Sequence, residues 1–284
     1  MKILATAICH KGLVRTNNED MILVNGNFLR DNSFCETFIL PTDTLLTFVV
    51  ADGMGGHNGG EIASELALKS FDNFILNLPD NLDTETLKQK IDLWVKTIHS
   101  EIIREGSTSP EFNGMGTTFT GIFTYQNRFF TVHVGDSRLY RFRNSILKQL
   151  TTDHSMRELT GNPDTPSNLI YNSIGAGDDA FADFNDITES ILNGDKFLIC
   201  SDGLTDMLDD DAICRLLEEQ KSPSDIASEA CNEGGKDNIS VLLLEVEDVV
   251  SQIIDECPED DSDSNNKGND KPKNKGEEVR RVVI

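Results

Sequence analysis

At residues 49–64 the chain reads VVADGMGGHNGGEIAS, and the rest of the sequence is organised around this stretch. Residues 45–51 form an apolar run with the β-branched and aromatic content of a buried strand. The run stops at a carboxylate, Asp52, and five of the next eight residues are glycine. Helical spacing of apolar residues follows over 61–76. This order predicts a strand that delivers an acid to a glycine-rich turn, where the backbone can approach an ion or phosphate closely. A plain tight turn with a solvated Asp52 explains the stretch alone equally well.

The composition is typical of a soluble protein with a packed core, and the length allows one large domain or two small ones. The chain has 284 residues, of which 38% are hydrophobic and 26% charged. Its net charge of −24 argues against nonspecific binding to nucleic acid or to an anionic membrane surface. No apolar run is long enough to span a bilayer, and the N-terminus lacks the long apolar core of a signal peptide. We therefore expect a cytoplasmic protein.

Periodicity predicts a body of alternating strands and helices over residues 1–250. Strands are expected at 1–10, 21–25, 45–51, 117–125, 128–134, 139–143, 146–150, 196–200 and 239–246, and helices at 61–76, 83–105, 204–207, 211–219 and 222–232. Residues 25–43 are expected to be irregular, and 178–195 are acidic and poorly apolar. From residue 255 the composition turns to Asp, Glu, Ser, Asn, Lys, Gly and Pro, which predicts a disordered tail over 255–284.

An acid next to a glycine or asparagine recurs at the ends of apolar strands. The four pairs are Asp52-Gly53, Gly135-Asp136, Asp202-Gly203 and Asp237-Asn238. Glu19 and Asp20, in a loop after the first strand, could join them at one rim of a sheet. Asp-Gly turns are common, and chance explains one or two such pairs well but four poorly.

Several carboxylates in one place cannot all ionise without compensation, and a divalent cation is the usual compensation. All-oxygen ligation suits Mg²⁺ or Mn²⁺ and not zinc. Two such ions can share a bridging hydroxide and stabilise an in-line attack on phosphorus. Arg15 would then clamp the phosphate through its bidentate fork.

Seven motifs in this order resemble the metal-dependent Ser/Thr protein phosphatases of type 2C, in their bacterial form. They are RTNNED at 15–20, DGMGGH at 52–57, GMGTT at 114–118, GDSR at 135–138, DHS at 153–155, SDGL at 201–204 and GKDN at 235–238. The resemblance covers residues 12 to about 246. It implies an α+β fold, a four-layer α-β-β-α sandwich of two antiparallel sheets flanked by helices.

The resemblance also implies roles for single residues. Asp52 would bridge two Mn²⁺ or Mg²⁺ ions, and the Gly53 carbonyl would bind one of them. Asp202 and Asp237 would complete the other, Glu19 would hold metal-bound water, and Asp20 would support it. Asp136 with Asp202 resembles the third-metal site of bacterial members, and Arg15 would bind the substrate phosphate. Arg15, Asp52 and Asp237 are thus the expected catalytic set.

The chain departs from the family pattern in two places. Met54 stands where many eukaryotic members have a histidine proposed as general acid, so the proton for the leaving group must come from metal-bound water or elsewhere. His57 lies nearby, but a structural or exposed role fits a tight-turn histidine better. Residues 155–173 look shorter than the usual bacterial flap, which puts substrate choice and the third metal in question.

The expected function is hydrolysis of phosphoserine and phosphothreonine on proteins, reversing a Ser/Thr kinase, by a monomer with no nucleic-acid or membrane partner. Two alternatives stay open at this point. One is a catalytically inactive phosphoprotein-binding member of the same fold, and the other is an acidic cation-binding protein without phosphate chemistry. Arg15 argues against the second, because a metal buffer has no use for it.

Overall fold

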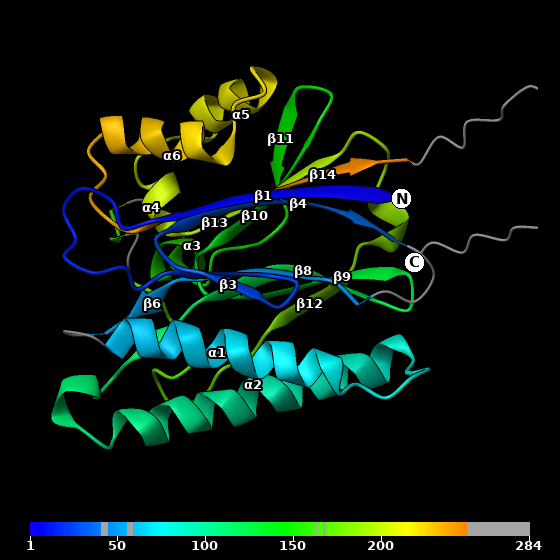
Figure 1. The fold of residues 1–284 in the computed structure, drawn as a ribbon. Coiled ribbons are helices and arrows are strands. Elements are labelled where there is room, and N and C mark those ends of the chain that lie inside the picture. Colours follow the sequence, from blue (N-terminus) through cyan, green and yellow to red (C-terminus); the bar gives the residue numbers. More distant parts are fainter. Residues whose placement is uncertain (41–44, 56–58, 163, 167–168, 249–284) are drawn as a thin grey trace, which may run out of the picture. The chain divides into compact units, whose positions relative to one another are not determined.

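The structure is a computed structural model that describes residues 1–40, 45–55, 59–162, 164–166 and 169–248. Within these residues two six-stranded sheets face each other (Figure 1). Sheet A has the order β11 (Ile146–Gln149), β10 (Arg138–Arg143), β13 (Lys196–Cys200), β14 (Ile239–Glu247), β1 (Lys2–His10) and β4 (Asn32–Ile39). Sheet B has the order β12 (Asp183–Asp186), β9 (Arg128–Val134), β8 (Phe119–Tyr125), β5 (Thr47–Ala51), β2 (Met21–Val24) and β3 (Asn27–Leu29). A short ribbon pairs β6 (Gly53–Met54) with β7 (Gly116–Thr117).

Helices cover the outer face of each sheet (Figure 1). The described helices are α1 (Gly59–Leu76), α2 (Thr84–Gly106), α3 (Met156–Thr160), α4 (Asp202–Thr205), α5 (Asp210–Glu218) and α6 (Pro223–Asn232), with 3₁₀ turns at Pro110–Phe112 and Thr188–Ser190. The pair α1 and α2 lies on sheet B, while α5 and α6 lie on sheet A. Every strand pair in the two sheets is antiparallel. The expected four-layer α-β-β-α sandwich is confirmed.

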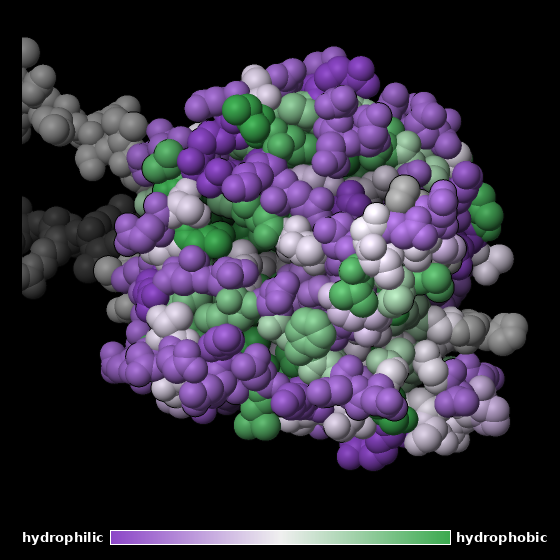
Figure 2. Space-filling model, turned by 180° about the vertical axis from the view of Figure 1, so that it is seen from behind, coloured by the Kyte–Doolittle hydropathy of each residue, from purple (hydrophilic) through white to green (hydrophobic). Residues whose placement is uncertain are grey.

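Inward-facing side chains, which alternate along the strands, fill the space between the two sheets. Along β1 every second residue is buried, so one face of this strand packs inward. All five residues of β5 are buried, because both of its faces are covered. Phe48 and Val50 belong to the core between the sheets, and Val49 and Ala51 to the core beneath the helices. Seen from behind, the surface is mostly hydrophilic with small separate apolar groups (Figure 2).

Aromatic side chains pack the helices α1 and α2 against each other and against sheet B. The Phe71 ring of α1 lies 4.9 Å from Trp94 of α2 and 4.8 Å from Phe119 of β8, measured between centroids, with edge contacts in both pairs. The start of α2 is capped by Asp83, whose side chain accepts a hydrogen bond from the Thr86 amide at 2.7 Å. The packing of this layer fixes the position of α1, the helix that follows the glycine-rich turn.

One expectation about a polar segment was wrong, and a second polar segment contains a strand that was not predicted. Residues 25–43 were expected to be irregular, yet β3 and β4 occupy most of the described part of them. The acidic stretch 178–195 contains β12. Both β4 and β12 are edge strands. Six of the eight residues of β4 are exposed and none of the four residues of β12 is fully buried, so neither sequence carries a clear apolar alternation. Residues 41–44 and the predicted tail at 255–284 lie outside the described residues, and no described helix is long and apolar enough to cross a membrane.

The pairing register brings the acid-bearing segments to one end of the sheets. Ala51, the last residue of β5, pairs with Met21, the first residue of β2. His10, the last residue of β1, pairs with Ile239, the first residue of β14. The strands β9 and β13 also end on this side, because each runs in the same direction as the strand two places away in its sheet, β5 and β1 respectively. The carboxylates that follow or precede these strands therefore meet.

Candidate active site

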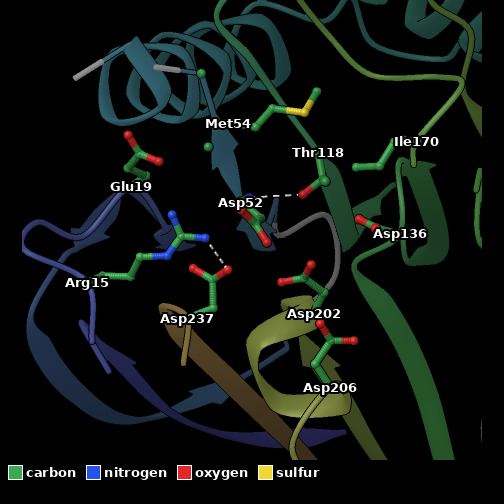
Figure 3. Close-up of a pocket in the computed structure, with 12 residues that line it drawn as sticks. Arg15, Glu19, Asp52, Met54, Thr118, Asp136, Ile170, Asp202, Asp206 and Asp237 are labelled. Atoms are coloured by element: carbon green, nitrogen blue, oxygen red, sulfur yellow. Dashed lines mark hydrogen bonds and ion pairs between the residues drawn. The ribbon is translucent and has the colours of Figure 1, made fainter. Parts of the chain in front are cut away.

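A cavity of about 410 Å³ opens where these strand ends meet (Figure 3). Its lining residues are Arg15, Glu19, Asp52, Gly53, Met54, Gly55, Thr118, Asp136, Ile170, Asp202, Asp206 and Asp237. Seven of the eight residues predicted from the sequence are in this list. The eighth, Asp20, does not line the cavity; it is buried, with only 1% of its surface exposed, and this burial and the charges of Asp202 and Asp237 raise its pKa. The structure thus brings together residues that are up to about 220 positions apart in the chain.

Asp52 is fixed in place by the strand that follows the second helix. Its amide donates to the Thr118 hydroxyl at 2.9 Å, and its carbonyl accepts from the Thr118 amide at 2.9 Å. The Thr117 hydroxyl donates to the same carbonyl at 3.0 Å. The backbone of Asp52 is therefore satisfied by protein groups, and its side chain is left to face the cavity (Figure 3).

Gly53 is required by close packing of three backbone segments. A Cβ atom at this position would lie 2.1 Å from the carbonyl oxygen of Gly60 and 2.5 Å from that of Glu19. A Cβ on Gly60 would in turn lie 2.7 Å from the Gly53 carbonyl and 2.8 Å from the Glu19 carboxyl carbon. The glycines of the opening stretch thus let the Asp52 turn, the first turn of α1 and the Glu19 loop come together.

Burial disfavours the charged forms of several carboxyls around the cavity. Burial, followed by the charges of neighbouring carboxylates, raises the pKa of Asp20 to about 7, of Asp136 to about 8 and of Asp202 to about 6. The same causes raise the pKa of Asp52 well above its ordinary value. Burial also raises the pKa of Glu19, against the opposing effect of Arg15. Arg15 alone therefore does not compensate the carboxylates of this cluster.

Two buried carboxylate oxygens have no hydrogen-bond partner among the described residues. They are Oδ1 of Asp20 and Oδ1 of Asp136. The other oxygen of Asp20 accepts a hydrogen bond from the Ser201 hydroxyl at 2.7 Å. A buried acceptor without a partner costs free energy, and a cation or an ordered water would satisfy it.

These donors fit hard divalent cations. The lining offers the carboxylate oxygens of Glu19 and five aspartates, and it contains no His or Cys. In the part of the chain that is described, no three His, Cys, Asp or Glu side chains are already gathered tightly enough to hold an ion among them. Mg²⁺ keeps several of its waters and uses only one or two protein carboxylates, so it does not need a closed cage of acids.

Arg15 contributes the one positive charge among the cavity-lining residues. Its Nη2 lies 2.5 Å from Oδ2 of Asp237, and this pair is drawn in Figure 3. The hydrogen bond to Asp237 raises the pKa of Arg15, which stays charged. The side chain is half exposed, at 50%, and that of Asp237 is 35% exposed. The guanidinium can therefore reach an anion that enters the cavity from solvent.

Asp206, which was not predicted from the sequence, lines the cavity beside Asp202 (Figure 3). Its amide donates to the Asp202 carbonyl at 2.7 Å, so the two acids lie one helical turn apart. That spacing of four residues was a signal available in the sequence. Burial raises the pKa of Asp206 as well. Met54 and Ile170 are the larger apolar side chains of the lining, and His57 lies outside the described residues.

Two buried histidines near the strand ends, His133 and His154, make structural contacts. His133 is buried inside β9, with 2% exposed, and its Nε2 lies 3.0 Å from the Thr152 carbonyl. His154 is buried too, and its Nδ1 accepts hydrogen bonds from the Gly135 amide at 3.1 Å and the Asn172 side chain at 2.8 Å. His154 thereby anchors the turn before Asp136 to the segment that ends at Asn172.

Known proteins resemble this chain over most of its length. The family described as Protein phosphatase 2C matches residues 21–230. The serine/threonine phosphatase stp of Listeria monocytogenes is 30% identical over 249 residues, which cover 83% of this chain and 92% of that protein. The serine/threonine protein phosphatase PstP of Mycobacterium tuberculosis is 31% identical over 266 residues, covering 84% of this chain and 44% of PstP.

Solved structures agree with the fold. The serine/threonine phosphatase of S. agalactiae superposes with a TM-score of 0.73 at 28% identity, over 86% of this chain and 100% of that one. The catalytic domain of PstP, solved in complex with two manganese ions, gives a TM-score of 0.65 at 28% identity, over 87% of this chain and 100% of that one. Nothing in these comparisons favours an inactive relative.

Proposed function

Because the chain belongs to the protein phosphatase 2C family and is a serine/threonine protein phosphatase, we propose that the acidic cavity is its active site and that it works with two Mn²⁺ or Mg²⁺ ions. The observation that carries this proposal is the convergence of Arg15 with five aspartates and a glutamate at the strand ends. An acidic cation-binding protein without phosphate chemistry would not need a guanidinium in that position.

The proposed ligands are the residues whose oxygens face the cavity. Asp52 would bridge the ions, the Gly53 carbonyl would bind one of them, and Asp202 and Asp237 would bind the other. Glu19 would act through water, with Asp20 supporting it. A third ion between Asp136 and Asp202 belongs to the same proposal, and the unpartnered Oδ1 of Asp136 supports it. When bound, the ions would supply Lewis-acid stabilisation and lower the pKa of water to generate a nucleophile.

The chain's own residues would bind and orient the phosphate ester. Arg15 would donate two hydrogen bonds to phosphoryl oxygens through its planar fork, exchanging its contact with Asp237 for the substrate. Among the described lining residues, Thr118 alone carries a hydroxyl, and this hydroxyl is engaged with the Asp52 amide and, at 2.7 Å, with Ser137. Direct attack by water without a covalent phosphoenzyme is therefore proposed.

The biological setting is part of the proposal. The relatives are serine/threonine phosphatases, so phosphoproteins are the substrates of this chain. We propose further that the phosphoproteins are products of a Ser/Thr kinase and that a monomer in the cytoplasm dephosphorylates them.

Substitution of the proposed ligands tests the assignment. Asp52→Asn and Asp237→Asn keep side-chain volume and remove the charge, so each is expected to abolish release of phosphate from a phosphothreonine peptide in Mn²⁺. Asp80→Asn, at an exposed position outside the cavity, is the matched control and should retain wild-type activity. Full activity in either cavity variant would contradict the assignment.

A further inference from the structure

The loop between β1 and β2 carries Arg15 and Glu19 but has no helix or strand of its own. Its backbone groups must therefore find partners elsewhere. The loop approaches the segment before β14 very closely. A Cβ on Gly12 would lie 2.0 Å from the Asp237 carbonyl, and the Leu13 amide donates to the Gly235 carbonyl at 2.8 Å. The position of Arg15 thus depends on this contact between the loop after β1 and the segment before β14.

One side chain, Asn238, satisfies three backbone groups of that loop. Its Oδ1 accepts a hydrogen bond from the Glu19 amide at 2.8 Å. Its Nδ2 donates to the Lys11 carbonyl at 2.8 Å and to the Asn17 carbonyl at 3.0 Å. The side chain is buried, with 4% exposed. These contacts span the loop from its first residue to the proposed ligand Glu19.

The three contacts match the chemistry of a carboxamide. An amide side chain offers one acceptor oxygen and two N–H donors on one planar group. A carboxylate of the same shape would keep the contact with the Glu19 amide but would turn an oxygen toward two carbonyl oxygens. An alanine would leave all three backbone groups unpaired in a buried place, which is costly.

Asn238 also lies beside the proposed ligand that contacts Arg15. Its own amide donates to Oδ1 of Asp237 at 2.8 Å, while Oδ2 of Asp237 contacts Arg15. The backbone of residue 238 therefore orients the Asp237 carboxylate, and its side chain holds the loop that carries Arg15. Asn238 therefore contacts both the loop that carries Arg15 and the carboxylate of Asp237.

We propose that Asn238 is a positioning residue, which sets the distance between the Arg15 loop and Asp237 and so places the substrate phosphate relative to the carboxylate cluster. This inference rests on the proposed function of the cavity. Asn238 does not line the cavity and would not touch the substrate. Because a misplacement of about 1 Å can cost about a hundredfold in rate, loss of its side-chain contacts has a measurable effect on catalysis.

The test compares Asn238→Asp and Asn238→Ala with the wild type in Mn²⁺ on a phosphothreonine peptide. We expect kcat/KM to fall on the order of tenfold or more, with KM raised because the Arg15 loop is released. Asn238→Asp is the near-isosteric variant, which addresses the case in which Asn238→Ala does not fold. Leu244→Ala, in the core of the same strand β14, is the control for simple loss of stability and should keep wild-type kcat/KM while folded.

A double-mutant cycle separates positioning from a purely structural role. In an Arg15→Ala background the Asn238 substitution should lower kcat/KM by less than about threefold, because the group it places is already gone. Additive effects of the two substitutions, or a wild-type kcat/KM in Asn238→Asp, would overturn the proposal.

Hydrogen exchange provides a readout that needs no catalysis. Loss of the Asn238 side chain should speed exchange of the Glu19 amide, and unchanged protection of that amide would overturn the proposal. If the wild type is inactive but the Glu19 amide is deprotected in the variant, the proposed function fails while the structural role of Asn238 stands.

Discussion

Arg15 shows how much of the site depends on single residues at unusual places. It is half exposed, on a loop without regular structure, and is still held against Asp237 by an ion pair. The acids at the strand ends could be predicted, because each stands beside a recognisable apolar strand. The role of Asn238 could not be predicted, because its partners Lys11 and Asn17 are 227 and 221 positions away. Such long-range hydrogen bonds leave no local pattern in a sequence.

Replacement of Arg15 should affect substrate binding much more than stability. Arg15→Ala is expected to raise KM for a phosphothreonine peptide about tenfold to a hundredfold, since a hydrogen-bonded charge pair contributes about 1.5–3 kcal/mol. Arg15→Lys should recover only part of this loss, because an ammonium cannot form the bidentate contact. Steady-state kinetics in Mn²⁺ measure the effect, with Arg104→Ala at an exposed helical position as control. An unchanged KM in Arg15→Ala would show that Arg15 does not bind the substrate phosphate.

At the scale of elements, the sequence predicted strands with buried faces and the tight turns between them. The two hairpins turn at Gln126-Asn127 and Asn144-Ser145, and all four residues have positive φ, from 50° to 61°. The edge strands β4 and β12 were missed because most residues of β4 are exposed and no residue of β12 is fully buried. The packing of two sheets into a sandwich was predicted only from the family resemblance, because the pattern of a strand does not specify which sheet faces pack together.

The helix α6 should depend on its N-terminal cap. The Ser222 hydroxyl accepts a hydrogen bond from the Asp225 amide at 3.2 Å, and the Asp225 carboxylate accepts one from the Ser222 amide at 3.0 Å. Ser222→Ala should lower the free energy of unfolding by about 1 kcal/mol. Ser228→Ala, at an exposed position inside the same helix, is the control. Denaturant unfolding measures the difference, and equal midpoints for the two variants would show that the cap is not needed.

The strand β9 carries a pH-sensitive group in its interior. Burial, followed by the charge of neighbouring His154, lowers the pKa of His133 from 6.5 to about 4. As pH falls from about 6.5 to about 4, the unfolded chain takes up a proton at this residue before the folded one does, so the folded state loses stability. The difference corresponds to about 3 kcal/mol below pH 4.

The variant His133→Gln isolates this contribution. Its free energy of unfolding should fall less steeply than that of the wild type over this pH range, in denaturant titrations at fixed Mn²⁺. Parallel curves for wild type and variant would show that His133 titrates normally in the folded protein.

For the whole molecule, the main electrostatic feature is an excess of negative charge, −24 at pH 7, with buried carboxyls gathered at one end of the described sheets. Like charges in a buried place oppose folding unless a cation compensates them. Bound ions would therefore stabilise the native state as well as catalyse, by RT ln(1 + [Mn²⁺]/Kd), or about 2.7 kcal/mol at a hundred times Kd.

The most direct test is phosphate release from a phosphothreonine peptide by the metal-stripped wild-type chain during a titration with Mn²⁺. The account predicts no release in EDTA, and activity that rises with added Mn²⁺ to a plateau as the cavity fills. Full activity in EDTA, or no activity at any Mn²⁺ concentration, would contradict it.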